Sequence, residues 1–233
     1  MKIGFDESIT TGVKIQIILR AICMFGLMFL ILFISAGRWD YWQGWGYFIL
    51  WIYVYLFSNI IIPSELVQER FKSSAGTKKW DEVFIVCHSL LALINPLIAA
   101  LDGGRYHWTG NFSSWVNVSA FIVIFLGLSL FIFSLWKNQF FSNTVRIQKD
   151  RGHHVIDKGP YAFIRHPGYA GFVISTLCIG LALNSLWALL PSGVLAIAFI
   201  IRTYLEDKTL QRELPGYAEY AAIVRYRLIP GIW

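Results

Sequence analysis

Long apolar runs separated by short polar segments dominate the chain. Four of these runs lie close to the roughly 20 residues that a helix needs to cross the hydrocarbon core of a bilayer. They cover residues 17–36, 41–62, 83–101 and 115–136. The pattern therefore predicts four membrane-spanning helices in the first 136 residues. Asn95-Pro96 is expected to kink the third of them.

A fifth apolar run, residues 169–204, is too long for one crossing and is divided by Asn184-Ser185. We expect a helical hairpin with arms at about 170–183 and 186–205, both entering from the same side of the membrane. The first arm is short and is expected to end against other helices. After the hairpin the sequence becomes an amphipathic tail.

Polar segments end the spans and indicate the orientation. Pro63 is expected to close the second span and to begin a polar loop over 63–82, while the longest polar segment covers 137–167. Of the 20 Lys and Arg residues, only Arg38 and Arg105 fall on one side of the predicted spans. The positive-inside rule then places both termini and the 137–167 segment in the cytoplasm.

Composition supports one membrane domain over residues 1–233, with four spans in 1–136 and the site-bearing part in 137–233. Hydrophobic residues make up 56% of the chain, which is typical of a membrane protein. The net charge of +6 lies in short loops between spans, which indicates topology and not nucleic-acid binding. The three cysteines lie in apolar runs, and the first span is expected to be a retained anchor and not a signal peptide.

Two polar clusters flank the predicted hairpin. One is the stretch 152–171, Gly-His-His-Val-Ile-Asp-Lys-Gly-Pro-Tyr-Ala-Phe-Ile-Arg-His-Pro-Gly-Tyr-Ala-Gly, and the other includes Arg202, Glu206, Asp207 and Glu213. Because a hairpin returns to the side that it left, the clusters must lie close together. They predict one composite site on the cytoplasmic side.

The chemistry of these clusters leaves structural alternatives open. Arg202 and Glu206 lie four residues apart and share a helix face. The two residues form either part of a substrate site or an ion pair at the membrane interface. The prolines of the first cluster predict an ordered irregular loop whose N–H groups suit a carboxylate or phosphate. The alternative is a structured turn with a snorkelling Arg165. No metal site is expected, because His153 and His154 are adjacent and lack ligands at suitable spacing.

The two clusters together resemble the isoprenylcysteine carboxyl methyltransferase family of integral membrane enzymes. The resemblance covers about residues 140–230 and includes Gly-Pro-Tyr, Arg-His-Pro-Gly-Tyr, Arg202-x-x-x-Glu206-Asp207-x-x-Leu210 and Gly216-Tyr217-x-x-Tyr220. It implies S-adenosylmethionine as the cofactor. It also implies a catalytic pair, Arg202 orienting the acceptor and Glu206 holding the cofactor. The implied cofactor-binding residues are Gln148, His153, His154, Val155, Ile156, Tyr161, Arg165, His166, Pro167, Gly168, Tyr169 and Glu206.

The resemblance leaves the methyl acceptor open. A prenylcysteine-type carboxylate, a phospholipid amine and a thiol are all compatible with it, and the first four spans are expected to form the entry for a lipid or hydrophobic acceptor. No obligate protein partner is evident. The alternatives are an NADPH-dependent membrane sterol or steroid reductase, which has a similar Arg-His-Pro-x-Tyr, and a non-catalytic scaffold or transporter. The membrane would be the inner or plasma membrane in a bacterium and the endoplasmic reticulum in a eukaryote.

Overall fold

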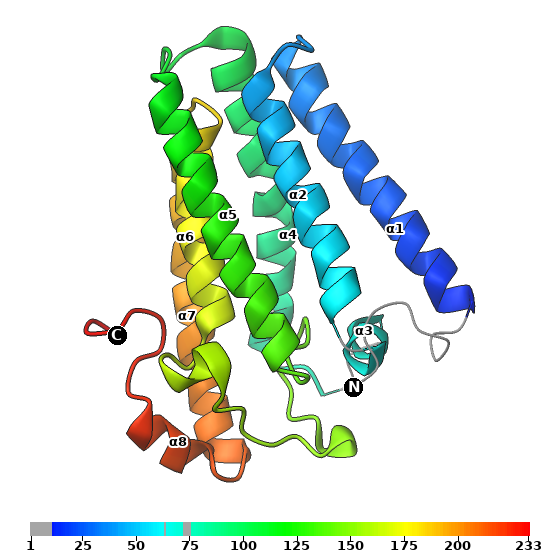
Figure 1. Cartoon of the computed structure of the whole chain (residues 1–233), viewed down its shortest axis with the longest axis vertical. Coiled ribbons are helices and arrows are strands. Elements are labelled where there is room, and N and C mark those ends of the chain that lie inside the picture. Colours follow the sequence, from blue (N-terminus) through cyan, green and yellow to red (C-terminus); the bar gives the residue numbers. More distant parts are fainter. Residues whose placement is uncertain (1–10, 63, 72–75) are drawn as a thin grey trace.

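A bundle of long helices forms the body of the protein in the computed structural model, which describes residues 11–62, 64–71 and 76–233 (Figure 1). The helices are α1 (Thr11–Phe29), α2 (Trp42–Ile61), α3 (Ser64–Phe71), α4 (Lys79–Ala99), α5 (Ser114–Lys137), α6 (Pro167–Ala182), α7 (Leu189–Glu213) and α8 (Tyr217–Ile223). No strand occurs within these ranges. The all-α prediction is confirmed.

Within the described ranges, five helices are long and apolar enough to cross a membrane. They are Thr11–Ile34, Trp42–Ile61, Lys79–Tyr106, Ser114–Lys137 and Leu189–Glu213. Many large apolar side chains on them face outward, for example Leu56, Leu126 and Ile197. An outward apolar surface of this extent suits lipid and not water. The protein is therefore a multi-pass integral membrane protein.

The predicted hairpin is present as α6 and α7, joined at Asn184 and Ser185. Asn184 turns the chain with a φ of 64°, and its side-chain oxygen accepts the N–H of Phe112 at 2.7 Å. Helix α6 has 16 residues, which span about 24 Å against a hydrocarbon core of about 30 Å. Helix α7, with 25 residues, extends beyond the end of α6 and carries the second polar cluster out of the bundle (Figure 1).

Small residues bring α5 and α6 into close contact. A Cβ added at Gly171 would lie 2.3 Å from the carbonyl oxygen of Gly127, and one at Gly127 would lie 2.3 Å from Oγ of Ser175. Membrane helices without a hydrophobic driving force associate through such close backbone packing. This contact holds α6 against α5, and α6 begins at the polar cluster.

Two features of the first half differ from the sequence expectation. The 63–82 segment, expected to be a polar loop, contains the helix α3; Pro63 itself lies outside the described residues. The third span, expected over 83–101, is longer: α4 continues through Pro96 to Ala99 and then widens into a π-helical turn, Ala100–Tyr106. Asp102 within that turn accepts hydrogen bonds from Thr109 and Ser185, which ties this end of the bundle to the hairpin turn.

Candidate active site

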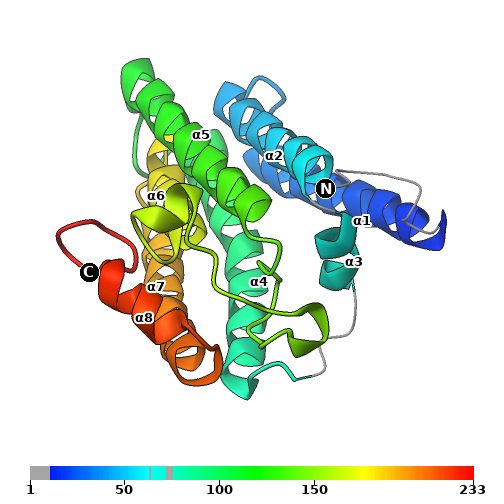
Figure 2. The ribbon, with the colours of Figure 1, turned by 60° about the horizontal axis from the view of Figure 1, so that its bottom comes forward.

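Residues 138–166, the start of α6, the end of α7 and α8 come together at one end of the bundle (Figure 2). They line a cleft. Its empty volume, including the open mouth, is about 720 Å³. It is lined by Asn138, Phe140, Phe141, Ser142, Thr144, Val145, Arg146, His153, His154, Val155, Ile156, Tyr161, Arg165, His166, Gly168, Tyr169, Glu206, Leu210, Leu214, Tyr217 and Tyr220. We call this space the C-terminal cleft. It unites the two predicted clusters, as the hairpin requires.

One wall of the C-terminal cleft is an irregular segment held by Gln148. The Gln148 side chain is buried and donates to the carbonyl oxygen of Phe140 at 2.7 Å. Its own carbonyl oxygen accepts from Arg151. Gly152 then turns the chain with a φ of 65°. Gln148 shapes the wall from behind and does not line the cleft.

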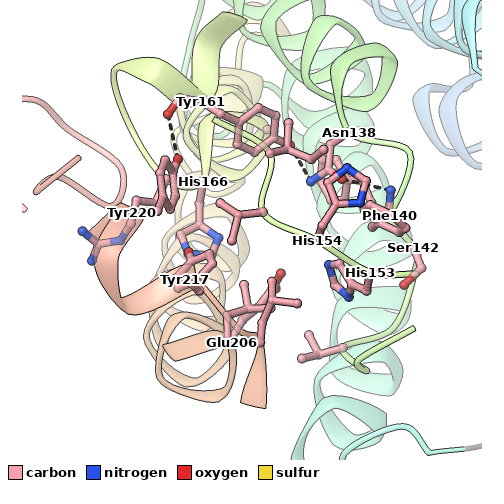
Figure 3. Close-up of a pocket in the computed structure, with 18 of the residues that line it drawn as sticks. Asn138, Phe140, Ser142, His153, His154, Tyr161, His166, Glu206, Tyr217 and Tyr220 are labelled. Atoms are coloured by element: carbon pink, nitrogen blue, oxygen red, sulfur yellow. Dashed lines mark hydrogen bonds between the residues drawn. The ribbon is translucent and has the colours of Figure 1, made fainter. Parts of the chain in front are cut away.

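Both histidines of the adjacent pair line the cleft (Figure 3). The His153 ring stacks on Phe140 at 4.5 Å between centroids, and the His154 ring meets the same phenyl edge-on at 4.9 Å. The backbone here is irregular, so adjacent side chains need not face apart. Burial, and then the nearby His154 and Arg151, lower the pKa of His153 to about 4, so its ring is neutral near pH 7. Among the described residues no group of three or more possible ligands could hold a metal ion.

The opposite wall presents the carboxylate of Glu206. Tyr169 donates its hydroxyl to Oε2 of Glu206 at 2.7 Å, which joins the first turn of α6 to α7. The Tyr169 ring lies nearly parallel to the ring of His166, with centroids 5.8 Å apart. The Glu206 side chain points toward the histidine pair across the cleft (Figure 3). Its Oε1 atom accepts no hydrogen bond from the described residues and is available to a ligand.

Asp207, next along α7, organises the base of the site. It is fully buried and accepts two hydrogen bonds from Arg165, at 2.7 and 2.9 Å. It also accepts from Arg227 at 2.9 Å, from Tyr217 at 3.1 Å and from Gln211 at 2.8 Å. Burial, and then the charge of Asp207, raise the pKa of Tyr217 well above its usual value, so the phenol remains a donor. Asp207 thus holds the loop, α7 and the tail together.

Arg165 lines the cleft, but its donors are engaged elsewhere. Besides its two bonds to Asp207, it donates to the carbonyl oxygens of Val224 and Arg225 at 2.7 and 2.8 Å. Burial opposes its charge, but the bonds to Asp207 outweigh it and raise the pKa of the guanidinium. Arg165 is therefore neither a snorkelling side chain nor a free anion binder in this arrangement.

Arg202 lies beside the cleft, behind Tyr169, and does not line it. Its guanidinium forms an ion pair with Asp81 at 2.9 Å and donates to the carbonyl oxygen of Asn143 at 2.9 Å. Its central carbon lies 4.5 Å from the ring centroid of Phe84 and 5.3 Å from that of Tyr169. Asp81 also accepts the N–H of Val145 at 2.7 Å, so α4, α7 and the cleft wall meet at this ion pair.

Ten of the 13 predicted site residues thus line the C-terminal cleft. The exceptions are Gln148, Arg202 and Pro167, a buried residue that opens α6. Some residues that line the cleft had no predicted role. Of these, Leu210, Tyr217 and Tyr220 belong to the motif on which the resemblance rests, and that motif could have identified them. Those between 138 and 146 stand in a stretch without a recognisable motif, and only the fold reveals them.

Comparison with known proteins bears on these residues directly. Residues 117–212 match the model of the isoprenylcysteine carboxyl methyltransferase family. The match confirms the resemblance over this segment. It includes most of α5, the whole of α6, most of α7 and the whole wall between 138 and 166. The chain is also similar to the cobalt-zinc-cadmium resistance protein CzcN of Cupriavidus metallidurans, with 29% identity over 157 residues, which cover 63% of this chain and 66% of that protein. The chain thus has a membrane methyltransferase-type segment around the C-terminal cleft.

Proposed function

We propose that the protein is an S-adenosylmethionine-dependent methyltransferase that acts on a lipid-like or small hydrophobic acceptor. The observation that carries the proposal is Glu206, whose carboxylate is fixed by Tyr169 and faces the histidine run across a cleft built from the family segment. The active site would face the cytoplasm, with both termini on that side.

The residues of the C-terminal cleft fit this cofactor. A methionine ammonium group suits the free oxygen of Glu206, through a charge-assisted hydrogen bond. The N–H groups of Gly168 and Tyr169 open α6 and have no backbone acceptor among the described residues, so they suit a carboxylate. The neutral ring of His153, with Val155 and Ile156, offers an apolar wall for an aromatic base.

When bound, S-adenosylmethionine supplies a methyl group whose transfer breaks its bond to sulfur, leaves the electron pair on sulfur and joins the carbon to a nucleophile. The protein must then align that nucleophile and exclude water. Buried Tyr161, whose carbonyl oxygen accepts the hydroxyl of Tyr220 at 2.7 Å, closes the cleft on the side of α8 (Figure 3). An amine or thiol acceptor would also have to lose a proton, which Glu206 could accept.

An apolar cavity within the membrane region supports a hydrophobic acceptor. It has an empty volume of about 510 Å³ and is lined by Tyr47, Trp51, His88, Ala92, Asn95, Ile124, Leu128, Phe172, Ser175, Thr176, Ile179 and Leu195. Phe199 separates it from the C-terminal cleft, with its ring 5.5 Å from Tyr169 on one side and 4.6 Å from Phe172 on the other. An acceptor chain in this cavity would bring its head toward Tyr169 and the cleft.

Ligand-induced stabilisation of the full chain in detergent tests the proposal. We expect S-adenosylhomocysteine to raise the midpoint of thermal unfolding and NADPH to leave it unchanged, because a ligand of the folded state shifts unfolding by mass action. Glu206→Gln should weaken S-adenosylhomocysteine binding by about tenfold or more, since it removes a charged acceptor. Glu219→Gln, an exposed change on α8, is the matched control and should bind as the wild type does. A shift with NADPH alone would contradict the proposal and favour a reductase.

A further inference from the structure

Arg70 on α3 stands out among the basic residues near the cleft because its charge has no partner within the part of the chain that the structure describes. Its Nη1 atom is buried and makes no hydrogen bond, and the guanidinium forms no ion pair with any residue that the structure describes. The other arginines nearby are paired. Arg146 contacts Glu69 and Asp150, Arg202 contacts Asp81, and Arg165 and Arg227 share Asp207.

Arg70 lies close to the core of the site. Its carbonyl oxygen accepts from the side chain of Asn143 at 3.4 Å, and the carbonyl oxygen of Asn143 accepts from Arg202 at 2.9 Å. Burial lowers the pKa of Arg70 to about 10, and the nearby Tyr169 raises it while Arg202 lowers it. Arg70 thus remains charged at pH 7, within electrostatic reach of both residues.

The surroundings place Arg70 between the bilayer and the C-terminal cleft. Helix α3 follows α2 directly, at the end of the bundle that carries the cleft (Figure 2). Its buried Leu66 and Val67 belong to an apolar cluster with Ile62 and Leu135, the ends of two membrane-spanning helices. Phe141 packs against this cluster and also lines the cleft, 5.6 Å from the ring of Tyr169.

A buried guanidinium N–H without an acceptor is costly, and buried charges are normally paired. Within the described residues, Arg70 has no such group, whereas Arg202 already has Asp81. We propose that Arg70 binds the anionic head group, a carboxylate or a phosphate, of an amphiphilic acceptor that enters from the bilayer. That the bound molecule is a methyl acceptor rests on the proposed function. The assignment narrows the acceptor to molecules with a negative charge near the reacting atom.

Matched amphiphiles test the assignment by direct binding to the full chain in nanodiscs of uncharged net composition. S-dodecyl-N-acetylcysteine carries a carboxylate, its carboxamide is the neutral counterpart, and dodecyl phosphate carries a phosphate. The wild type should bind the carboxylate about tenfold or more tightly than the carboxamide, the usual size of a charge-assisted contact. In Arg70→Gln this ratio should fall to about one, and Arg70→Lys should restore part of it.

Arg212→Gln is the matched control. Arg212 is exposed at the end of α7, and its substitution also removes one positive charge. This variant should keep the wild-type ratio. Equal ratios in Arg70→Gln and the wild type, or no preference for charge in the wild type, would overturn the assignment. If Arg70→Gln does not fold, Arg70→Lys decides the matter. A carboxylate-to-carboxamide ratio in Arg70→Lys equal to that of the wild type would contradict a contact made by the guanidinium.

Two further arms separate the possible sources of the anion. Inorganic phosphate and acetate should compete only weakly, because the apolar chain contributes to binding; full competition at equal concentration would show a site for free anions and overturn the lipid assignment. Affinity for S-adenosylhomocysteine should be the same in Arg70→Gln and the wild type. A selective loss there would assign Arg70 to the cofactor's carboxylate instead. If the wild type binds no S-adenosylhomocysteine but keeps the charge preference, the proposed function fails while the anion site stands.

Discussion

At the scale of single residues, the site separates into groups that face the cleft and groups that hold those in place. Glu206 and Asp207 are neighbours on α7, yet one points into the cleft and the other is fully buried beneath it. The sequence motif contains both, and from it alone Asp207 could equally be a proton acceptor. Only the fold shows that its oxygens are occupied by Arg165, Arg227 and Tyr217.

Asp207→Asn should therefore destabilise the fold without removing a group from the cleft. It leaves the buried Arg165 and the partly exposed Arg227 without a counter-charge, and breaking a buried pair typically costs about 3–5 kcal/mol. Thermal unfolding in detergent, monitored by tryptophan fluorescence, should show a clearly lower midpoint. Asp157→Asn, an exposed change in the same cleft segment, should leave the midpoint unchanged. A midpoint for Asp207→Asn equal to that of the wild type would contradict a structural role.

Some residues of the cleft could not be predicted from sequence patterns. His153, His154 and Tyr169 stand in recognisable motifs, whereas Phe140 and Ser142 stand in a stretch without one. They reach the cleft because Gln148 binds the carbonyl oxygen of Phe140 and folds the segment back. That contact depends on irregular backbone, for which the sequence has no periodic signal.

At the scale of elements, hydrophobic length alone predicts the spans and the hairpin. Each span is an apolar run bounded by polar residues, and Asn184 marks the turn because it tolerates a positive φ. Helix α3 could not be predicted in the same way. Its eight residues mix Leu66 and Val67 with charged neighbours, and two buried apolar side chains are too few to make a strong period.

The contact between α5 and α6 carries a prediction at this scale. Gly171→Leu should destabilise the protein strongly, because its Cβ would collide with backbone atoms of α5 that cannot move aside. Gly193→Leu is the matched control, since a Cβ at Gly193 on α7 would meet nothing within 4 Å. We expect a loss of roughly 3 kcal/mol or more for the first and little change for the second. Similar unfolding midpoints for the two variants would show that α5 and α6 can separate at little cost.

The whole molecule combines an apolar body with a polar cap at one end. The start of α1, the helix α3, the cleft segment 138–166 and α8 all lie at that end, and the residues between α4 and α5 lie at the other (Figure 1). Under the proposed function, a soluble cofactor would reach the cap from water, and an apolar acceptor would approach between helices from lipid. This division follows from the hairpin, which brings both polar clusters to one side. The match to the methyltransferase family includes the cleft segment 138–166 of this cap, but not α3 or α8.

The distribution of charge leads to the last prediction, the orientation of that cap. Arg38 and Arg105 lie at the end opposite the cleft, whereas Arg146, Arg165 and Arg227 lie around it. Because short basic segments stay in the cytoplasm, the cap should face inward. Single cysteines at the exposed positions Trp108 and Asp157, in a chain whose native cysteines are replaced, report the two ends.

A membrane-impermeant maleimide applied to intact cells should label Trp108→Cys and leave Asp157→Cys unlabelled until the membrane is permeabilised. Both sites are outside the spans, so a difference in labelling reflects sidedness and not burial in lipid. The reverse pattern would place the cleft outside, where the cell's soluble methyl donor could not reach it, and would contradict the proposed function together with the orientation. Labelling of both from outside would mean that one of the five long helices does not cross the membrane.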